Sequence, residues 1–128
     1  MPDYVDTSAF IKLVRSEPES SALRRELAGR ELLSSSLLIV EGRRAARRYG
    51  ELASSRARAA LTAITMIALD EPILNTAAEL DPPELRLPDA LHLATIASLG
   101  NDIERLYCYD ARLSGAARTL GIEVSQPN

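Results

Sequence analysis

The sequence predicts an α/β fold in which helices cover both faces of a parallel sheet. Three observations support this class: short apolar segments alternate with helical segments, turn residues separate them, and no repeat or low-complexity tract interrupts the series. At 128 residues the chain can form a core without disulfides or structural metal. We therefore expect a single domain spanning residues 1–128.

Five segments are expected to form strands, because each joins strand-forming residues to a turn or a capping residue. In chain order these are "PDYVD" at residues 2–6, "ELLSS" at 31–35, "MIALD" at 66–70, "RLYCYD" at 105–110 and "IEV" at 122–124. The serine cluster after the second segment can cap the helix that follows it.

The intervening segments have the apolar spacing of helices. The expected helices span residues 8–15, 19–28, 37–50, 55–65, a short stretch starting at Asp70 and Pro72, 89–99 and 111–120. Proline suits a first helical turn, and Gly121 closes the last helix. The segment "DPPELRLP" is the one clear irregular loop.

Composition restricts the class of protein. Hydrophobic residues make up 46% and charged residues 26% of the chain, as in soluble globular proteins. Cys108 is the only cysteine, so an intramolecular disulfide or a site with several thiolates is excluded. The start of the chain is acidic and lacks the pattern of a secretory signal. The most apolar stretch, residues 61–69, is shorter than the roughly 20 residues that span a bilayer. We expect a cytoplasmic protein.

Several acidic residues follow predicted strands. Asp6 ends the first strand, Asp110 ends "RLYCYD", and Asp89 begins the helix after the proline-rich loop. Ligands of parallel sheets bind beyond the carboxyl ends of strands, where these acids would lie. The alternative is structural, because aspartate is a preferred helix N-cap. Each acid alone fits that role, whereas three in these positions favour a site.

Glu41 lies inside a predicted helix, beside the apolar stripe of Leu38, Ala45 and Tyr49. It can form an exposed ion pair with Arg44, or it can point towards the other three acids. Periodicity leaves both possibilities open. Four carboxylates without cysteine or histidine would form a hard oxygen site suited to Mg²⁺ or Mn²⁺. Such ions serve phosphate chemistry, and a cation would relieve the repulsion among clustered carboxylates.

A basic patch interrupts this acidic chain of net charge −3. Six arginines stand against one acid, Glu51, between residues 42 and 58: Arg43, Arg44, Arg47, Arg48, Arg56 and Arg58. The patch can attract a phosphate backbone or an acidic partner, or it can be a solvated helix face. The sequence leaves these three possibilities open.

Four quoted stretches resemble PIN-domain ribonucleases, and in particular the VapC toxins of bacterial type II toxin–antitoxin systems. They are "YVDTSAFIKL", "SSLLIVEGRRAARR", "RLPDALHLATIASLG" and "LYCYDARLSGAARTLGIEV", in that order across the whole chain. The resemblance implies that Asp6, Glu41, Asp89 and Asp110 are the acidic quartet that binds metal and carries out catalysis. Ser8 is similar to the hydroxyl that supports the quartet, with Thr7 and Arg112 as further supporting residues. Two departures are small: Pro88 precedes Asp89, and Gly42 follows Glu41 where many relatives carry a larger residue.

The resemblance further implies a PIN-like three-layer α/β/α sandwich on a five-stranded parallel sheet, usually as a homodimer. The implied activity is that of a Mg²⁺-dependent endoribonuclease, with Mn²⁺ as a plausible substitute, which cleaves RNA phosphodiesters by a metal-activated water. The implied partners are a VapB-like antitoxin and an RNA substrate, either tRNA or rRNA, without a membrane.

Other functions fit the residues less well. A metal-free route through the RNA 2′-hydroxyl typically uses two histidines, whereas His92 is the only one and is expected to be a structural residue near the core. A phosphoacceptor signalling domain needs a lysine after a late strand, and the only lysine is Lys12. A catalytically inactive PIN-fold module that binds RNA or protein remains an alternative, although none of the four acids is missing.

Overall fold

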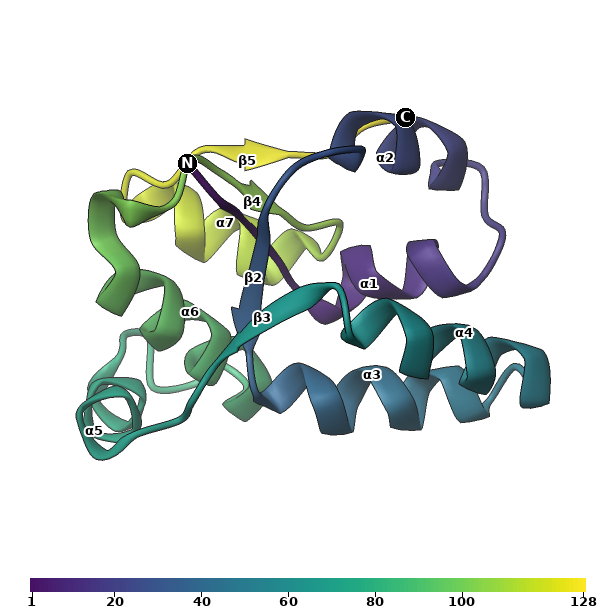
Figure 1. Ribbon diagram of the computed structural model, residues 1–128. Helices are drawn as coiled ribbons and strands as arrows, with labels where there is room; N and C mark the ends of the chain where they lie inside the picture. Colours follow the sequence, from purple (N-terminus) through teal and green to yellow (C-terminus); the bar gives the residue numbers. More distant parts are fainter.

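Five parallel strands form one sheet in the order β3-β2-β1-β4-β5 (Figure 1). The computed structural model describes residues 1–128. The strands are β1 (Asp3–Val5), β2 (Leu32–Ser35), β3 (Ile64–Ile67), β4 (Leu106–Tyr107) and β5 (Val124–Ser125). Strand β1 is central, since β2 and β3 follow on one side and β4 and β5 on the other. The switch in strand order therefore lies at the carboxyl end of β1, where open parallel sheets bind ligands.

Seven α-helices and one short 3₁₀ helix surround the sheet. They are α1 (Thr7–Val14), α2 (Ser20–Leu27), α3 (Leu37–Arg47), α4 (Glu51–Leu61), α5 (Glu71–Glu79), α6 (Leu87–Leu99), the 3₁₀ helix Gly100–Asp102, and α7 (Ala111–Thr119). The predicted α/β class with five parallel strands is confirmed.

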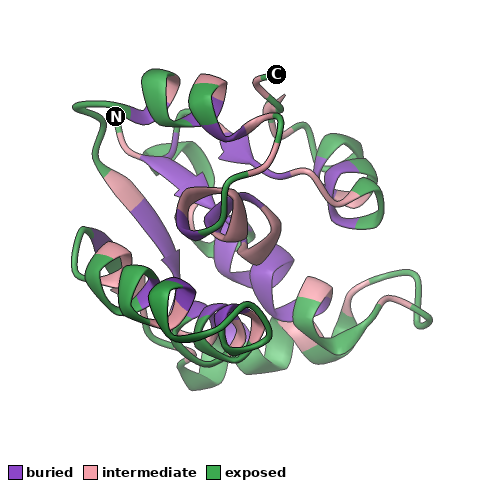
Figure 2. Ribbon diagram, turned by 90° about the vertical axis from the view of Figure 1, so that its right-hand side faces the viewer, coloured by how far each residue is buried: buried purple, intermediate pink, exposed green.

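Two buried clusters show how the helices cover the sheet. Val5 and Tyr107 pack with side chains of α1 to α4 on one face. Tyr4, Leu106 and Cys108 pack with side chains of α6 and α7 on the other. Successive strand residues point to opposite faces, so a two-sided sheet needs the nearly continuous apolar strands seen here. The result is a three-layer α/β/α arrangement with its buried residues concentrated along the strands and α6 (Figure 2).

Several predicted boundaries were wrong by a few residues. The third strand lies at Ile64–Ile67 instead of 66–70, because Asp70 leaves the strand and caps α5 through the Ile73 N–H. Helix α4 spans Glu51–Leu61 instead of 55–65, because Gly50, with φ of 95°, turns the chain directly into it. Helix α6 begins at Leu87, two residues early. Pro88 fits its first turn, where no N–H donor is required.

Gly42 allows α3 to pack closely against α1. A Cβ atom at this position would lie 2.7 Å from Cε2 and 2.9 Å from Cδ2 of Phe10, which is fully buried. A larger residue would have to displace the Phe10 ring or move α3, together with the neighbouring Glu41. Close packing against Phe10 therefore explains why residue 42 is a glycine.

We expect Gly42→Ala to be less stable than Gly115→Ala by about 1–3 kcal/mol, the usual cost of overpacking a core. Gly115 lies inside α7 with open space around its Cα, so its alanine variant should gain about 1 kcal/mol from helix propensity. Urea denaturation of both variants measures the difference. Equal stabilisation by the two substitutions would show that Phe10 yields without cost.

None of the helices combines the length and the apolar character that crossing a membrane requires.

Candidate active site at the carboxyl edge of the sheet

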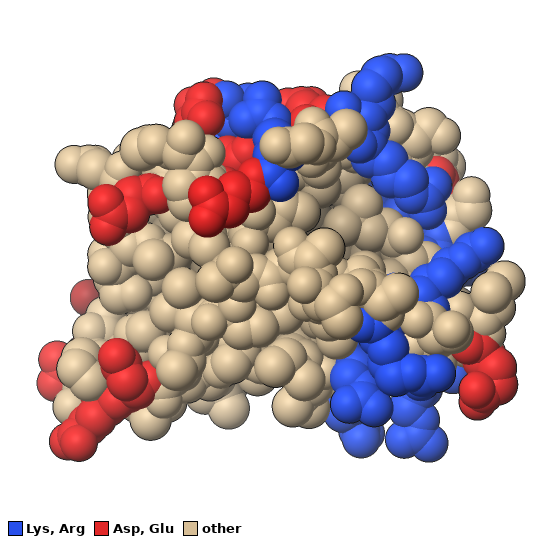
Figure 3. All heavy atoms as spheres, in the orientation of Figure 1, with Lys and Arg blue, Asp and Glu red and all other residues tan.

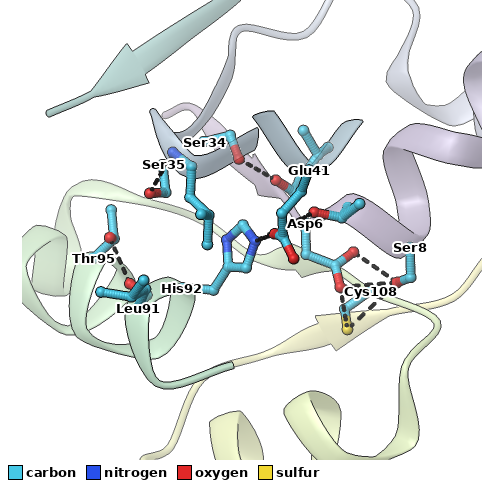
Figure 4. Close-up of polar contacts among 12 residues, drawn as sticks. Asp6, Ser8, Ser34, Ser35, Glu41, Leu91, His92, Thr95 and Cys108 are labelled. Atoms are coloured by element: carbon cyan, nitrogen blue, oxygen red, sulfur yellow. Dashed lines mark hydrogen bonds and ion pairs between the residues drawn. The ribbon is translucent and has the colours of Figure 1, made fainter. Parts of the chain in front are cut away.

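Asp6 lies at the switch point, directly after β1, and is 3% exposed. One carboxylate oxygen, Oδ1, accepts from the Ala9 backbone N–H at 2.9 Å and so caps α1. The Ser8 hydroxyl lies 2.7 Å from Oδ1 and 2.8 Å from Oδ2. Ser8 also accepts from the Tyr109 N–H, beyond β4, at 2.8 Å. The hydroxyl thus ties Asp6 to the neighbouring strand connection (Figure 4).

Glu41 points into the same region from α3. Its Oε1 atom accepts from the Thr7 hydroxyl at 2.7 Å and lies 2.9 Å from Nε2 of His92 (Figure 4). No ion pair joins Glu41 to Arg44, although sequence periodicity left that possibility open. The half-buried carboxylate is therefore fixed by Thr7, the first residue of α1, and by His92, which lies inside α6.

His92 is 2% exposed and connects Glu41 to the core. Its Nδ1 atom lies 2.8 Å from the hydroxyl oxygen of Tyr4, which also accepts from the Ser35 N–H at 3.0 Å. The Glu41 carboxylate can only accept, so Nε2 carries a hydrogen and donates to it. In a neutral imidazole Nδ1 is then an acceptor, and the Tyr4 hydroxyl donates to it. The expectation that His92 is a hydrogen-bonded residue near the core matches this position.

Asp110 and Asp89 occupy two further connections. Asp110 caps α7, since its Oδ1 accepts from the Leu113 N–H at 3.0 Å. It follows β4, which pairs with β1, so it shares a sheet edge with Asp6. Asp89 lies in the first turn of α6 and is partly buried. Asp6 and Asp110 are thus helix N-caps, as the structural alternative predicts. They can cap helices and still lie at the same edge of the sheet.

The charges of the other three acids act on Asp89. Burial raises the pKa of Asp89, and the negative charges of Asp110, Asp6 and Glu41 raise it further against the opposing effect of His92. Burial also raises the pKa of Asp6, despite hydrogen bonds from Ala9, Ser8 and Cys108. Burial acts in the same direction on Glu41, but hydrogen bonds from His92 and Thr7 hold its pKa below the usual range.

The donor set fits a hard divalent cation better than zinc, because it consists of carboxylate oxygens. The side chains do not converge on one point as they stand: no three acidic, histidine or cysteine side chains are placed to ligate a single ion. Asp6 and Glu41 are instead held by hydroxyl, backbone and imidazole donors. Repulsion among the acids is what a cation would relieve.

The supporting residues divide into two groups. Thr7 and Ser8 contact Glu41 and Asp6 directly. Arg112 is exposed and forms no ion pair with any acid. It lines a hollow of about 650 Å³ together with Arg86 and Asp89. Its position leaves it free to meet a phosphate.

Sequence reasoning missed two contacts to the acids. The Cys108 thiol, in the predicted strand "RLYCYD", donates to Oδ2 of Asp6 at 3.1 Å. Burial, followed by the charge of Asp6, raises the pKa of this thiol to about 12, so it stays protonated and remains a donor. The second is the link from Tyr4 through His92 to Glu41. Both depend on strand pairing and helix packing, which no local sequence signal reports.

The raised pKa of Asp6 has a consequence for stability. When the pKa is higher in the folded chain than in the unfolded chain, the folded chain binds the proton more tightly. The free energy of unfolding therefore falls as the pH rises from about 4, the ordinary aspartate value, through the folded-state pKa. Asp6→Asn, which keeps an oxygen for the Ala9 N–H, should therefore melt at a higher temperature than the parent chain at neutral pH in EDTA. Thermal unfolding over a pH series measures this, and the difference should vanish below about pH 4. A lower melting temperature at neutral pH would contradict it.

Comparison with known proteins agrees with the fold. The PIN domain family model matches residues 4–118. Ribonuclease VapC46 of Mycobacterium tuberculosis (strain ATCC 25618 / H37Rv) is 45% identical over 126 residues, which cover 98% of this chain and 97% of that protein. Ribonuclease VapC47 of Mycobacterium tuberculosis (strain CDC 1551 / Oshkosh) is 36% identical over 130 residues, covering 97% and 96%. The chain therefore belongs to the PIN-domain family and, within it, to the VapC group.

Solved structures share the fold at lower identity. The sarcin–ricin loop cleaving toxin VapC20 of Mycobacterium tuberculosis superposes with a TM-score of 0.73 at 22% identity, over 89% of this chain and 94% of that chain. A toxin–antitoxin complex from Klebsiella pneumoniae gives 0.73 at 22% identity over 98% of both chains. VapBC2 from Rickettsia felis, bound to a DNA fragment from its promoter, gives 0.74 at 11% identity over the full length of both.

Proposed function

We propose that this chain is a Mg²⁺-dependent endoribonuclease and the toxin of a type II, VapBC-like toxin–antitoxin pair. The observation that carries the proposal is the position of Asp6, Asp110 and Asp89 at the carboxyl edge of the sheet of a PIN fold, with Glu41 held beside them by Thr7 and His92. Ribonuclease names among relatives up to 45% identical over nearly the whole chain support it. Residues 1–128 would act as one PIN domain.

In this proposal Asp6, Asp89 and Asp110 hold Mg²⁺, or Mn²⁺ in its place, with Glu41 binding directly or through a water. When bound, the cation activates a water and offsets negative charge at the phosphorus. The chain's own residues prepare the ligands. Ser8 fixes both oxygens of Asp6, while Thr7 and His92 fix Glu41. Arg112, exposed beside Asp89, is placed to contact a substrate phosphate.

The proposed partners follow from membership of the VapC group. A VapB-like antitoxin would cover the acidic site, and the protein would act in the cytoplasm on tRNA or rRNA, as a homodimer. The toxin–antitoxin complexes among the solved structures support an antitoxin partner. Their identities of 22% and 11% extend the likeness to the fold alone.

RNA cleavage under metal control tests the proposal. The purified chain should cut total RNA into discrete fragments in Mg²⁺ buffer, EDTA should stop the reaction, and excess Mg²⁺ or Mn²⁺ should restore it. The physical reason is that carboxylates without a cation repel a phosphodiester instead of activating water beside it. Cleavage that persists after chelation would contradict the metal-dependent chemistry, and intact RNA under all conditions would contradict the nuclease.

A further inference from the structure

Six arginines on α3, at its C-cap or on α4 have no acidic partner, and five of them line adjoining hollows. This set of five, which we name the arginine track, consists of Arg43, Arg44, Arg47, Arg48 and Arg58. All five are exposed, and the ion pairs of the chain involve other residues. Arg43 with Arg47, and Arg44 with Arg48, are like charges four residues apart, a spacing that weakens a helix. No ion pair with an acid of the chain offsets the repulsion within these two pairs.

Three adjoining hollows lead from Thr7 and Ser8, which hold Glu41 and Asp6, along the track. The first, of about 340 Å³, is lined by Thr7, Ser8 and Arg48, and also by Lys12 and Glu17. Arg48 also lines the second hollow, together with Arg44 and Arg47. Arg47 in turn lines the third, where Arg43 and Arg58 face Glu51 and Ser54. Shared residues thus connect the hydroxyls that hold Asp6 and Glu41 to the junction of α3 and α4.

Charge is unevenly distributed over the surface along this path. Lysine and arginine side chains gather along the right-hand side of this view, over α2 as well as α3 and α4, whereas acidic side chains lie mostly on the left (Figure 3). The first hollow also contains the rings of Tyr49 and Tyr109, and Tyr49 is 44% exposed. Cations combined with tyrosine rings are typical of grooves that bind a single nucleic-acid strand.

We propose that the arginine track is the surface along which the RNA backbone leaves the acidic site. The proposal rests on the proposed function, and it assigns the track to substrate binding instead of to an acidic protein segment. The second and third hollows contain no apolar side chain. A docked protein segment buries apolar side chains at the centre of its interface, whereas a phosphate backbone requires only charge.

Salt-dependent RNA binding tests the track. The double substitution Arg44→Gln and Arg48→Gln is compared with Arg25→Gln and Arg118→Gln, which removes the same charge from exposed positions on α2 and α7. Both pairs are placed in the Asp89→Asn chain, so that binding of a short fluorescein-labelled single-stranded RNA is measured by anisotropy without cleavage. If each track arginine meets one phosphate, the slope of log K against log salt should become shallower by about 1.4. Affinity at 0.1 M salt should fall about 25-fold.

The control pair should change the slope and the affinity only slightly, and circular dichroism should show all variants folded. Equal losses in both pairs would overturn the track, because they would reflect net charge alone. An unchanged RNA affinity combined with weaker binding of the cognate antitoxin would also overturn it and would assign the surface to the antitoxin. The unsubstituted chain is assayed for cleavage in parallel, so a failure of the proposed function appears as intact RNA there, separate from any result on the track.

Discussion

Asp89→Asn should lower the rate of RNA cleavage at least about 100-fold, since even residues that only orient metal ligands cost 10–100-fold when they are removed. Among the four acids, Asp89 has a pKa raised by burial and by the charges of Asp110, Asp6 and Glu41 together. A cation bound beside Asp89 would offset these three charges and favour its ionised form. Asparagine keeps the shape and removes the charge, so the fold should be retained.

Asp70→Asn is the matched control for this substitution. Asp70 is an exposed aspartate that follows β3 and caps α5 through the Ile73 N–H, as Asp6 and Asp110 cap α1 and α7. It makes no contact with the acidic site. Its variant should cleave RNA at the parent rate, measured by initial rates on a labelled RNA. Full activity in Asp89→Asn, or equal losses in both variants, would contradict a catalytic role for the acidic cluster.

His92→Ala should lower the free energy of unfolding by about 2–4 kcal/mol, because it empties a buried site and breaks the links to Tyr4 and Glu41. Cleavage should also fall, by about tenfold, since Glu41 loses the imidazole that holds it in place. Urea denaturation and cleavage rates measure the two effects separately. Tyr4→Phe, which keeps the ring and removes only the hydroxyl, should cost about 1 kcal/mol and leave most of the activity.

A positioning role for His92 has a signature that a purely structural role lacks. If His92 acts through Glu41, the double variant Glu41→Gln with His92→Ala should lose no more activity than Glu41→Gln alone. Activity losses that multiply in the double variant would show that the two residues act independently. The stability loss of His92→Ala should persist in either case, because it arises from the core.

The fold was predictable from the sequence because each local signal agreed with the global one. The alternation of "DYV", "LLSS" and the later strands with helical segments requires a parallel sheet, and the acids after β1 and β4 indicate its functional edge. Boundaries failed where two local signals competed. Asp70 reads equally as the end of a strand and as a helix cap, and Pro88 reads equally as a loop residue and as a first-turn residue.

The sequence predicts the acidic residues of the candidate site, but not the side chains that hydrogen-bond to them. Asp6, Asp89 and Asp110 follow turns or strands, so their sheet edge can be inferred from the order of the elements. The donors to Glu41 and Asp6 come from distant segments: His92 from α6 and Cys108 from the end of β4. Helix packing and strand order determine these contacts, and neither can be inferred from one sequence. The same holds for the orientation of Glu41, which helix periodicity did not decide.

Calorimetric titration with Mn²⁺ tests most directly whether the acids form a metal site. The parent chain should bind Mn²⁺ with measurable heat in RNA-free buffer, Asp70→Asn should bind it equally well, and Asp89→Asn should lose most of that affinity. A parent chain that binds no Mn²⁺, or an Asp89→Asn variant that binds it as tightly as the parent, would contradict the assignment.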